Sequence, residues 1–326
     1  MNCRFWLVLF LAAALTASAA TPREEWNNNM AAAARWNAEG NFTQVELALK
    51  AALVAANKLG PATHEAALAL DQLGSAYFIL GRMQSSEHSF LGAIRIWEKS
   101  AVTPNFPLAK SLSGLVDVYL HTGRLLAAER LPLQSVLNAL EAGGAPANQL
   151  ALLVEAIALV HSEAKRFEQA ESMYLRALNL WRSSADSDKR TIAVVLGNIG
   201  DFYAVHGQYS KAESYLEQSI EAWSLLGAPR PESIQPLLNL ASIQEKLRRN
   251  EKAAQLLERA LGLIDKHLSP DHPLLVLALE NYADVLRSLK RGTAAKAADR
   301  RAKALMKSAI VPSEKHTIDI RELEKK

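Results

Sequence analysis

Few residues in this chain of 326 have the types and the spacing that catalysis needs. The sequence contains no glycine-rich phosphate loop, no His-Glu-x-x-His motif and no Gly-x-Ser-x-Gly motif. Its eight histidines occur singly, and no two of them lie four residues apart, so a helical metal site is not predicted. The sequence therefore predicts a protein that is not an enzyme and that needs no cofactor or metal.

The side chains best suited to binding a polypeptide are three asparagines that recur at a nearly fixed interval. They are Asn198, Asn239 and Asn281, separated by 41 and 42 residues. A carboxamide offers both a donor and an acceptor to a peptide unit, so a row of asparagines could hold an extended segment. Alternatively, asparagine is simply common at this point of a repeated unit. Both interpretations stay open at this stage.

The interval reflects an internal repeat that runs through most of the chain. A small residue, flanked by large apolar ones, recurs at steps of 41 or 42 residues: Ala33, Gly74, Val116 (the one bulky exception), Ala158, Gly200, Ala241 and Ala283. Within each copy the apolar positions are spaced by three and four, which predicts two amphipathic helices. The small residue marks a close crossing of these helices. Glycines at 40, 81, 123 and 207 mark the tight turn between them.

The spacing of Leu196, Ile199, Gly200, Tyr203 and Gly207 resembles the signature of the tetratricopeptide repeat. The copies of about 42 residues are similar to the longer repeat of the kinesin light chain type. Its linker Gly-Pro-Asp-His-Pro is nearly reproduced by residues 269–273, Ser-Pro-Asp-His-Pro. The resemblance covers about residues 25–308. It implies an all-α fold, a right-handed α-solenoid of about seven helix-turn-helix repeats over residues 21–308, with one continuous core.

The resemblance also implies which residues could bind a partner. In this fold the first helix of each repeat lines the concave surface, and the three asparagines share position six of that helix. Asp201, Asp284 and Arg287 lie on the same predicted face. The face carries eight acids against three bases, which favours partners with basic or polar side chains: Asp71, Asp117, Glu155, Glu163, Asp201, Glu245, Glu280 and Asp284 against Lys110, Lys246 and Arg287. The lysine and arginine clamp of chaperone-binding members is not reproduced, because positions five and six hold no base.

Some residues depart from the repeat or have a structural interpretation. Pro132 falls inside a second helix and should kink it. His272 and the glycosylation sequon that begins at Asn41 are best explained as helix caps. Trp97, Trp181 and Trp223 recur at one position and should pack between repeats. Beyond the repeats, the tail at 309–326 is expected to cap the exposed end of the array.

The first twenty residues have the features of a secretory signal peptide. Arg4 precedes an unbroken apolar run of eleven residues at 5–15, and Ala17-Ser18-Ala19 provides a cleavage signal. Such a run is too short to span a membrane, which takes about 20 residues, and no later segment is apolar enough. Because the only cysteine, Cys3, precedes the cleavage site, the exported chain would contain no disulfide. We expect a periplasmic or extracellular protein without a transmembrane segment.

Composition limits the remaining functional classes. The chain is 49% hydrophobic, which excludes intrinsic disorder, and its net charge of +3 gives no case for nucleic-acid binding. The hypothesis is a non-catalytic scaffold or adaptor for a protein or peptide partner in the cell envelope or outside the cell. The alternatives are a structural, self-assembling envelope component, or a small-ligand sensor or enzyme. The sequence specifies no oligomeric state.

The signal-peptide hypothesis predicts the mature N-terminus. Sequencing the protein purified from the cells that make it should give a chain that starts directly after Ala19 or Ala20. A mature protein that retains Met1 would contradict export through this segment.

Overall fold

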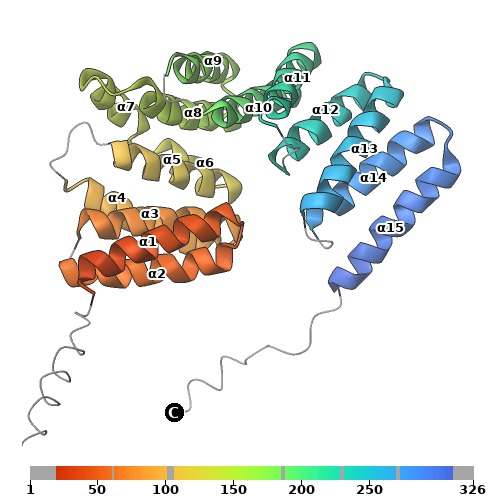
Figure 1. Cartoon of the computed structure of the whole chain (residues 1–326). Helices are drawn as coiled ribbons and strands as arrows, with labels where there is room; N and C mark the ends of the chain where they lie inside the picture. The colour runs from red at the N-terminus through yellow and green to blue at the C-terminus, as the bar shows by residue number, and fades with distance from the viewer. Residues whose placement is uncertain are drawn as a thin grey trace, which may run out of the picture. The chain divides into compact units, whose positions relative to one another are not determined.

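The structure of the chain is a computed structural model. It describes residues 20–60, 62–100, 106–184, 188–227, 231–268 and 272–310. Within these residues every regular element is helical (Figure 1). The predicted leader and most of the tail, at 311–326, lie outside the described residues, as do linker residues 269–271.

The chain divides into two compact units, Met1–Ser184 and Ala185–Lys326, and each is described by itself. Buried residues form hydrophobic cores within each unit, and the expectation of one continuous core stays a prediction. The first unit contains α1 (Pro22–Ala38), α2 (Phe42–Leu59), α3 (His64–Ile79), α4 (Met83–Trp97), α5 (Phe106–His121), α6 (Leu125–Glu129), α7 (Leu133–Ala142), α8 (Ala147–Glu163) and α9 (Phe167–Ser183). The second contains α10 (Lys189–Val205), α11 (Tyr209–Ser224), a 3-10 turn (η1, Pro231–Ser233), α12 (Ile234–Lys246), α13 (Asn250–His267), α14 (Pro273–Ser288) and α15 (Gly292–Ile310).

These helices form pairs that follow the predicted repeats. The first unit holds α1/α2, α3/α4, α5 with α6 and α7, and α8/α9, and the second holds α10/α11, α12/α13 and α14/α15. Figure 1 shows the two helices of a pair lying side by side, most plainly for α1 and α2 and for α14 and α15. The prediction of an all-α fold built from helix-turn-helix repeats is confirmed.

The turn inside every pair has one geometry. The turn contains position fifteen of the repeat, counted so that the small residue is at position eight. The residue at position fifteen has a positive φ, between 57° and 73°, in all seven repeats: Gly40, Gly81, Gly123, Lys165, Gly207, Arg248 and Lys290. The four glycines predicted for this turn therefore occupy the left-handed conformation that glycine adopts without strain. The next residue donates its backbone N–H to the carbonyl five residues back, as in Arg82 to Tyr77 at 2.8 Å. This bond closes the first helix in the manner of a Schellman motif.

The small residue of each repeat lies where the two helices of a pair cross. In α10 a Cβ added at Gly200 would lie 2.6 Å from Cγ of Leu216 and 3.2 Å from its backbone N. In α3 a Cβ at Gly74 would lie 2.8 Å from the ring of Phe90. Both helix pairs therefore approach too closely for even a methyl group at these positions, as the repeat pattern predicts.

An ion pair links most repeats to the one before. The residue directly after the one with positive φ is arginine in five repeats. Each of these arginines forms an ion pair, at 2.5 to 3.0 Å, with a glutamate on the second helix of the preceding repeat. The pairs are Arg82–Glu46, Arg124–Glu87, Arg166–Glu129, Arg249–Glu213 and Arg291–Glu251. The first repeat of the second unit has Gln208 at this position. Repeat spacing alone does not reveal this series, because the two partners of each pair come from neighbouring repeats.

Pro132 interrupts its helix rather than merely kinking it. The second helix of the third repeat ends as α6 at Glu129 and restarts as α7 at Leu133, with Pro132 at the N-cap. A proline has no N–H to donate and its ring clashes with the preceding turn, which explains the break. A pocket of about 360 Å³ lies beside the break and is lined in part by His161 and Arg166.

The predicted capping residues begin their helices as expected. The Asn41 side chain accepts the backbone N–H of Gln44 at 3.2 Å, and His272 Nδ1 accepts that of Leu274 at 3.2 Å. Trp97 and Trp223 are buried among helices, in agreement with a packing role. Across the described part of the chain, no helix is long and apolar enough to cross a membrane.

Two glycine-to-alanine variants test the crossing. Gly200→Ala should lower the free energy of unfolding by about 1–3 kcal/mol, because the methyl group overpacks against Leu216. Gly262→Ala, in the middle of α13, is the matched control. Its Cβ would meet no atom within 4 Å, so it should raise stability by up to about 1 kcal/mol through helix propensity. Chemical denaturation measures both, and equal effects of the two variants would contradict the close crossing.

Candidate functional site

The three predicted asparagines occupy equivalent positions on the first helices of the second unit. Asn198 lies on α10, Asn239 on α12 and Asn281 on α14, and all three side chains are half-buried. Because α10 contacts α12 and α12 contacts α14, the three positions follow one another across neighbouring helices. The structure thus provides the row of positions that the ladder hypothesis requires, while a bound peptide remains a prediction.

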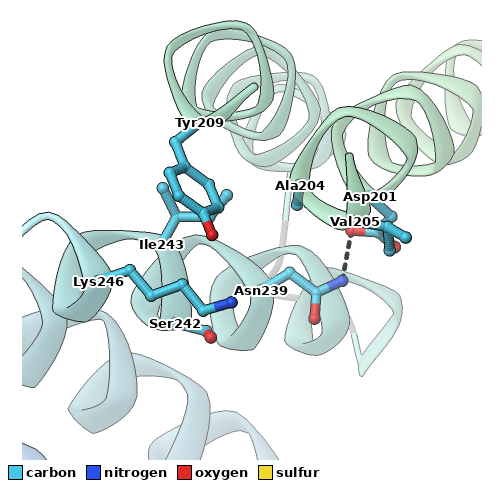
Figure 2. A pocket seen from close by; sticks show the side chains of 8 residues that line it. All are labelled: Asp201, Ala204, Val205, Tyr209, Asn239, Ser242, Ile243 and Lys246. Atoms are coloured by element: carbon cyan, nitrogen blue, oxygen red, sulfur yellow. Dashed lines mark hydrogen bonds between the residues drawn. The ribbon is translucent and has the colours of Figure 1, made fainter. Parts of the chain in front are cut away.

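The structure joins two of the predicted site residues directly. Asn239 donates from Nδ2 to Oδ1 of Asp201, which lies one repeat earlier, on α10 (Figure 2). Asn239 Oδ1 in turn accepts a hydrogen bond from Gln235 at 2.9 Å. The carboxamide therefore has one of its two N–H donors and one acceptor position engaged within the protein. A partner could still use the second N–H and the second lone pair of the Asn239 carboxamide, and the second oxygen of Asp201.

This pair forms one side of a pocket of about 330 Å³ in the second unit. Figure 2 shows Tyr209 of α11 and Lys246 of α12 at the other side, and the Lys246 Nζ lies 5.4 Å from the centre of the Tyr209 ring. The lining combines an acid, an amide, a hydroxyl, a cation and apolar surface: Asp201, Ala204, Val205, Tyr209, Asn239, Ser242, Ile243 and Lys246. Val205 is 82% exposed, so it adds accessible apolar surface to the pocket.

The environment of Asp201 changes its protonation. Burial raises the pKa of Asp201 to about 6, and the hydrogen bond from Asn239 opposes this shift only in part. The carboxyl group is therefore ionised at neutral pH but becomes neutral under mildly acidic conditions. A binding surface that contains it would change charge over the same range.

Asp284 and Arg287 lie together at the other predicted part of the site. Arg287 forms an ion pair with Asp284 on its own helix and a second one with Asp299 of α15 at 2.8 Å. Both side chains of the first pair are about half exposed, Arg287 at 51% and Asp284 at 57%. The charge of Asp284 is thus balanced locally, so Asp201 carries more of the predicted acidic character than Asp284 does.

Two acids on the first helices of the first unit also have defined surroundings. Asp71 is buried, accepts from Ser111 Oγ at 2.7 Å and pairs with Lys110 at 2.9 Å. Lys110 is the one base at position two of a repeat, and it is already paired with Asp71. Partial desolvation and the negative charge of Glu155 raise the pKa of Asp117 to about 7. The Asp117 side chain is nevertheless reached by solvent, which weakens its effect on stability.

Sequence reasoning missed part of this pocket. Lys246 and Ser242 lie at concave-face positions of the repeat, but the repeat pattern marks Lys246 only as one of eleven charges on that face. Tyr209 belongs to the second helix of its repeat, so the positional rule for first helices excludes it. Its proximity to Lys246 depends on how the second helix of one repeat packs on the first helix of the next. In the described part of the chain, no group of three or more histidine, cysteine or acidic side chains could hold a metal ion.

Paired helices with a recurring turn and a recurring close crossing define a helical-repeat protein. The sequence model of the tetratricopeptide repeat matches residues 148–224 and 191–266. A relative from Arabidopsis thaliana, Protein KINESIN LIGHT CHAIN-RELATED 2, is 23% identical over 261 residues, which are 78% of this chain and 38% of the relative. The chain therefore spans well under half the length of that relative.

Solved structures agree on the fold. BtubC (BKLC) from P. vanneervenii has a TM-score of 0.60 at 18% identity, covering 70% of this chain and 92% of that chain. A Rap protein complexed with Competence and Sporulation Factor has a TM-score of 0.53 at 15% identity, covering 88% of this chain and 97% of that one. At these identities the likeness concerns the fold alone. Together the findings show that this chain is similar to tetratricopeptide repeat proteins, including a distant kinesin light chain-related one, and that it shares their fold.

The raised pKa of Asp201 predicts a pH-dependent effect of Asp201→Asn. A carboxyl whose folded pKa exceeds its unfolded value costs stability as pH rises from about 4 through 6. Asparagine keeps an acceptor oxygen for Asn239 and removes the charge. The variant should therefore be more stable than the wild type by roughly 1–3 kcal/mol at pH 8, from about 1.4 kcal/mol per pKa unit.

Urea unfolding at several pH values measures this difference. The gain should shrink towards zero below pH 4, where Asp201 is protonated in both states. A gain that is constant with pH, or that grows as pH falls, would contradict the raised pKa.

Proposed function

We propose that this protein is an exported, non-catalytic scaffold that binds an extended segment of a partner polypeptide on the first helices of its second unit. The tetratricopeptide repeats support a protein-binding role in general. The proposal adds the location of the site, the extended conformation of the ligand and the compartment.

The observation that carries the proposal is the pocket between α10, α11 and α12. It offers an acceptor from Asp201, a hydroxyl from Ser242 and the ammonium group of Lys246 within one recess. An extended peptide exposes alternating N–H and C=O groups, so it can use donors and acceptors that are mixed in this way. The equivalent asparagines on α10 and α14 extend the polar row to either side of the pocket.

The chemistry of the lining favours a polar segment. Asp201 can accept from a basic or amide side chain of the partner, whereas Lys246 can pair with a carboxylate or a carbonyl oxygen. Val205 and Ile243 provide apolar surface for a methylene or methyl group. A fold relative, the Rap protein, is found in complex with Competence and Sporulation Factor, which supports this fold as one that accommodates a binding partner.

The proposed compartment rests on the sequence of the first twenty residues. A basic residue, a short apolar run and a small-residue cleavage signal are typical of export. A chain without cysteine after residue 3 also suits an oxidising environment, because no thiol is available for wrong pairing.

Site-specific photo-crosslinking in the native cells tests the site. A photoreactive amino acid replaces Val205, which lines the pocket, or Leu225, which is similarly exposed at 75% but lies outside it. We expect a defined partner protein to be captured at position 205 and not at position 225, with the captured peptide identified by mass spectrometry.

The asparagines are tested in the same background. Changing Asn198, Asn239 and Asn281 to alanine should reduce capture at position 205 by about tenfold or more, because peptide groups in the recess lose their partners. Gln255→Ala, an exposed change on α13, is the control. Unchanged capture with an intact circular dichroism spectrum would place the site elsewhere. Capture of only a second copy of this chain would favour a self-assembling component instead.

A further inference from the structure

A second pocket in the second unit has a different chemical character. It measures about 410 Å³ and lies between α11, η1, α12 and α13. Its lining is Ile220, Trp223, Ser224, Gly227, Ser233, Leu237, Arg259, Gly262, Leu263 and Lys266. None of these residues lines the pocket around Asp201 and Asn239. The size falls within the range of pockets that hold small molecules, about 300–1,000 Å³.

Gly262 helps to keep this pocket open, because it places no side chain on the face of α13 that lines it. A Cβ at Gly262 would meet no atom within 4 Å. Glycine destabilises a helix interior relative to alanine, so its presence here is not explained by helix stability.

The charges at the pocket are all of one sign. Arg259, Gly262, Leu263 and Lys266 are spaced by three and four residues, so they share one face of α13. No acid lines the pocket, and within the described residues neither Arg259 nor Lys266 forms an ion pair. Both cations are exposed, whereas Trp223 and Leu237 are buried. The recess is therefore apolar inside and positive where it meets solvent.

The indole of Trp223 adds apolar surface to the lining. Its Nε1 is buried and has no hydrogen-bond partner among the described residues, and the same is true of Trp181 at the same repeat position in the first unit. The N–H therefore marks no site. What distinguishes Trp223 is that it lines a pocket with two cations.

We propose that this pocket binds a small amphiphilic carboxylate, with its apolar chain against Trp223 and Leu237 and its carboxylate at Arg259 and Lys266. The exposed cations meet the charged end at the mouth, and the apolar lining gains from burying a chain of several carbons. The inference does not depend on the peptide site of the first pocket.

Isothermal titration calorimetry of the full mature chain with octanoate tests the proposal. Octanoate should bind at one site per chain. The neutral 1-octanol and the cationic octyltrimethylammonium, which have the same chain length, should bind at least about tenfold more weakly, because the cations no longer assist. Affinity for octanoate should fall as salt is raised, since the cations are exposed.

Three variants locate the site. Gly262→Leu should abolish binding by filling the pocket, while its thermal midpoint stays equal to or above that of the wild type, so that lost binding cannot reflect unfolding. Arg259→Gln should weaken octanoate about fivefold without changing 1-octanol. Trp223→Phe, which removes only the N–H and part of the ring, should weaken it several-fold.

Lys296→Gln removes an exposed cation of α15 from the same unit and serves as the charge control. Octanoate binding that is absent, that survives in Gly262→Leu, or that falls equally in Arg259→Gln and Lys296→Gln would overturn the proposal. Equal affinity for octanoate and 1-octanol would overturn the assignment of an anionic ligand. These outcomes are independent of capture at Val205, so the two proposals fail separately.

Discussion

One backbone hydrogen bond, repeated seven times in the described residues, sets the geometry on which the rest of the structure depends. In every pair the first residue after the turn donates its N–H to the carbonyl five residues back, at 2.7 to 2.9 Å, across a residue with positive φ. This closure ends the first helix and fixes the direction in which the second begins. At Lys165, Arg248 and Lys290 the turn keeps its shape without glycine, although a side chain there costs about 1–2 kcal/mol. The closure is thus maintained even where it is strained.

The closed turn places the next residue where it can reach the preceding repeat. In five repeats this residue is an arginine that bonds a glutamate one repeat earlier. Exposed ion pairs of this kind stabilise by about 0–1 kcal/mol each, so burial between helices must supply most of the cohesion. The glycines at the close crossings make this burial possible. Because they have no side chain, Phe90 packs directly on the helix backbone at Gly74, and Leu216 packs on it at Gly200. Every repeat has the closed turn, and most repeats add the ion pair to it.

On this regular framework the binding features come from positions that differ between repeats. The first pocket is lined by Lys246 and Tyr209, and the second by Arg259, Gly262 and Lys266. The break at Pro132 likewise lies beside a pocket in the first unit. The framework tolerates such changes because each repeat packs mainly on its neighbours, so that a local departure does not propagate through the array. Rigid helices then hold the differing side chains in defined positions.

The sequence by itself determined the helix pairs, the turns and the crossings. Apolar residues at spacings of three and four define a buried face, glycine at a turn defines a left-handed residue, and a polar side chain before a helix defines a cap, as at His272. Each of these depends on local conformation. The periodicity also placed Asn198, Asn239 and Asn281 on one row. It did not reveal that Asn239 donates to Asp201 or that Arg287 bridges Asp284 and Asp299. Those partners, both pockets and the division into two units were decided by the tertiary structure, because repeat spacing specifies which face a side chain occupies, whereas packing of neighbouring repeats decides which groups come within hydrogen-bonding distance.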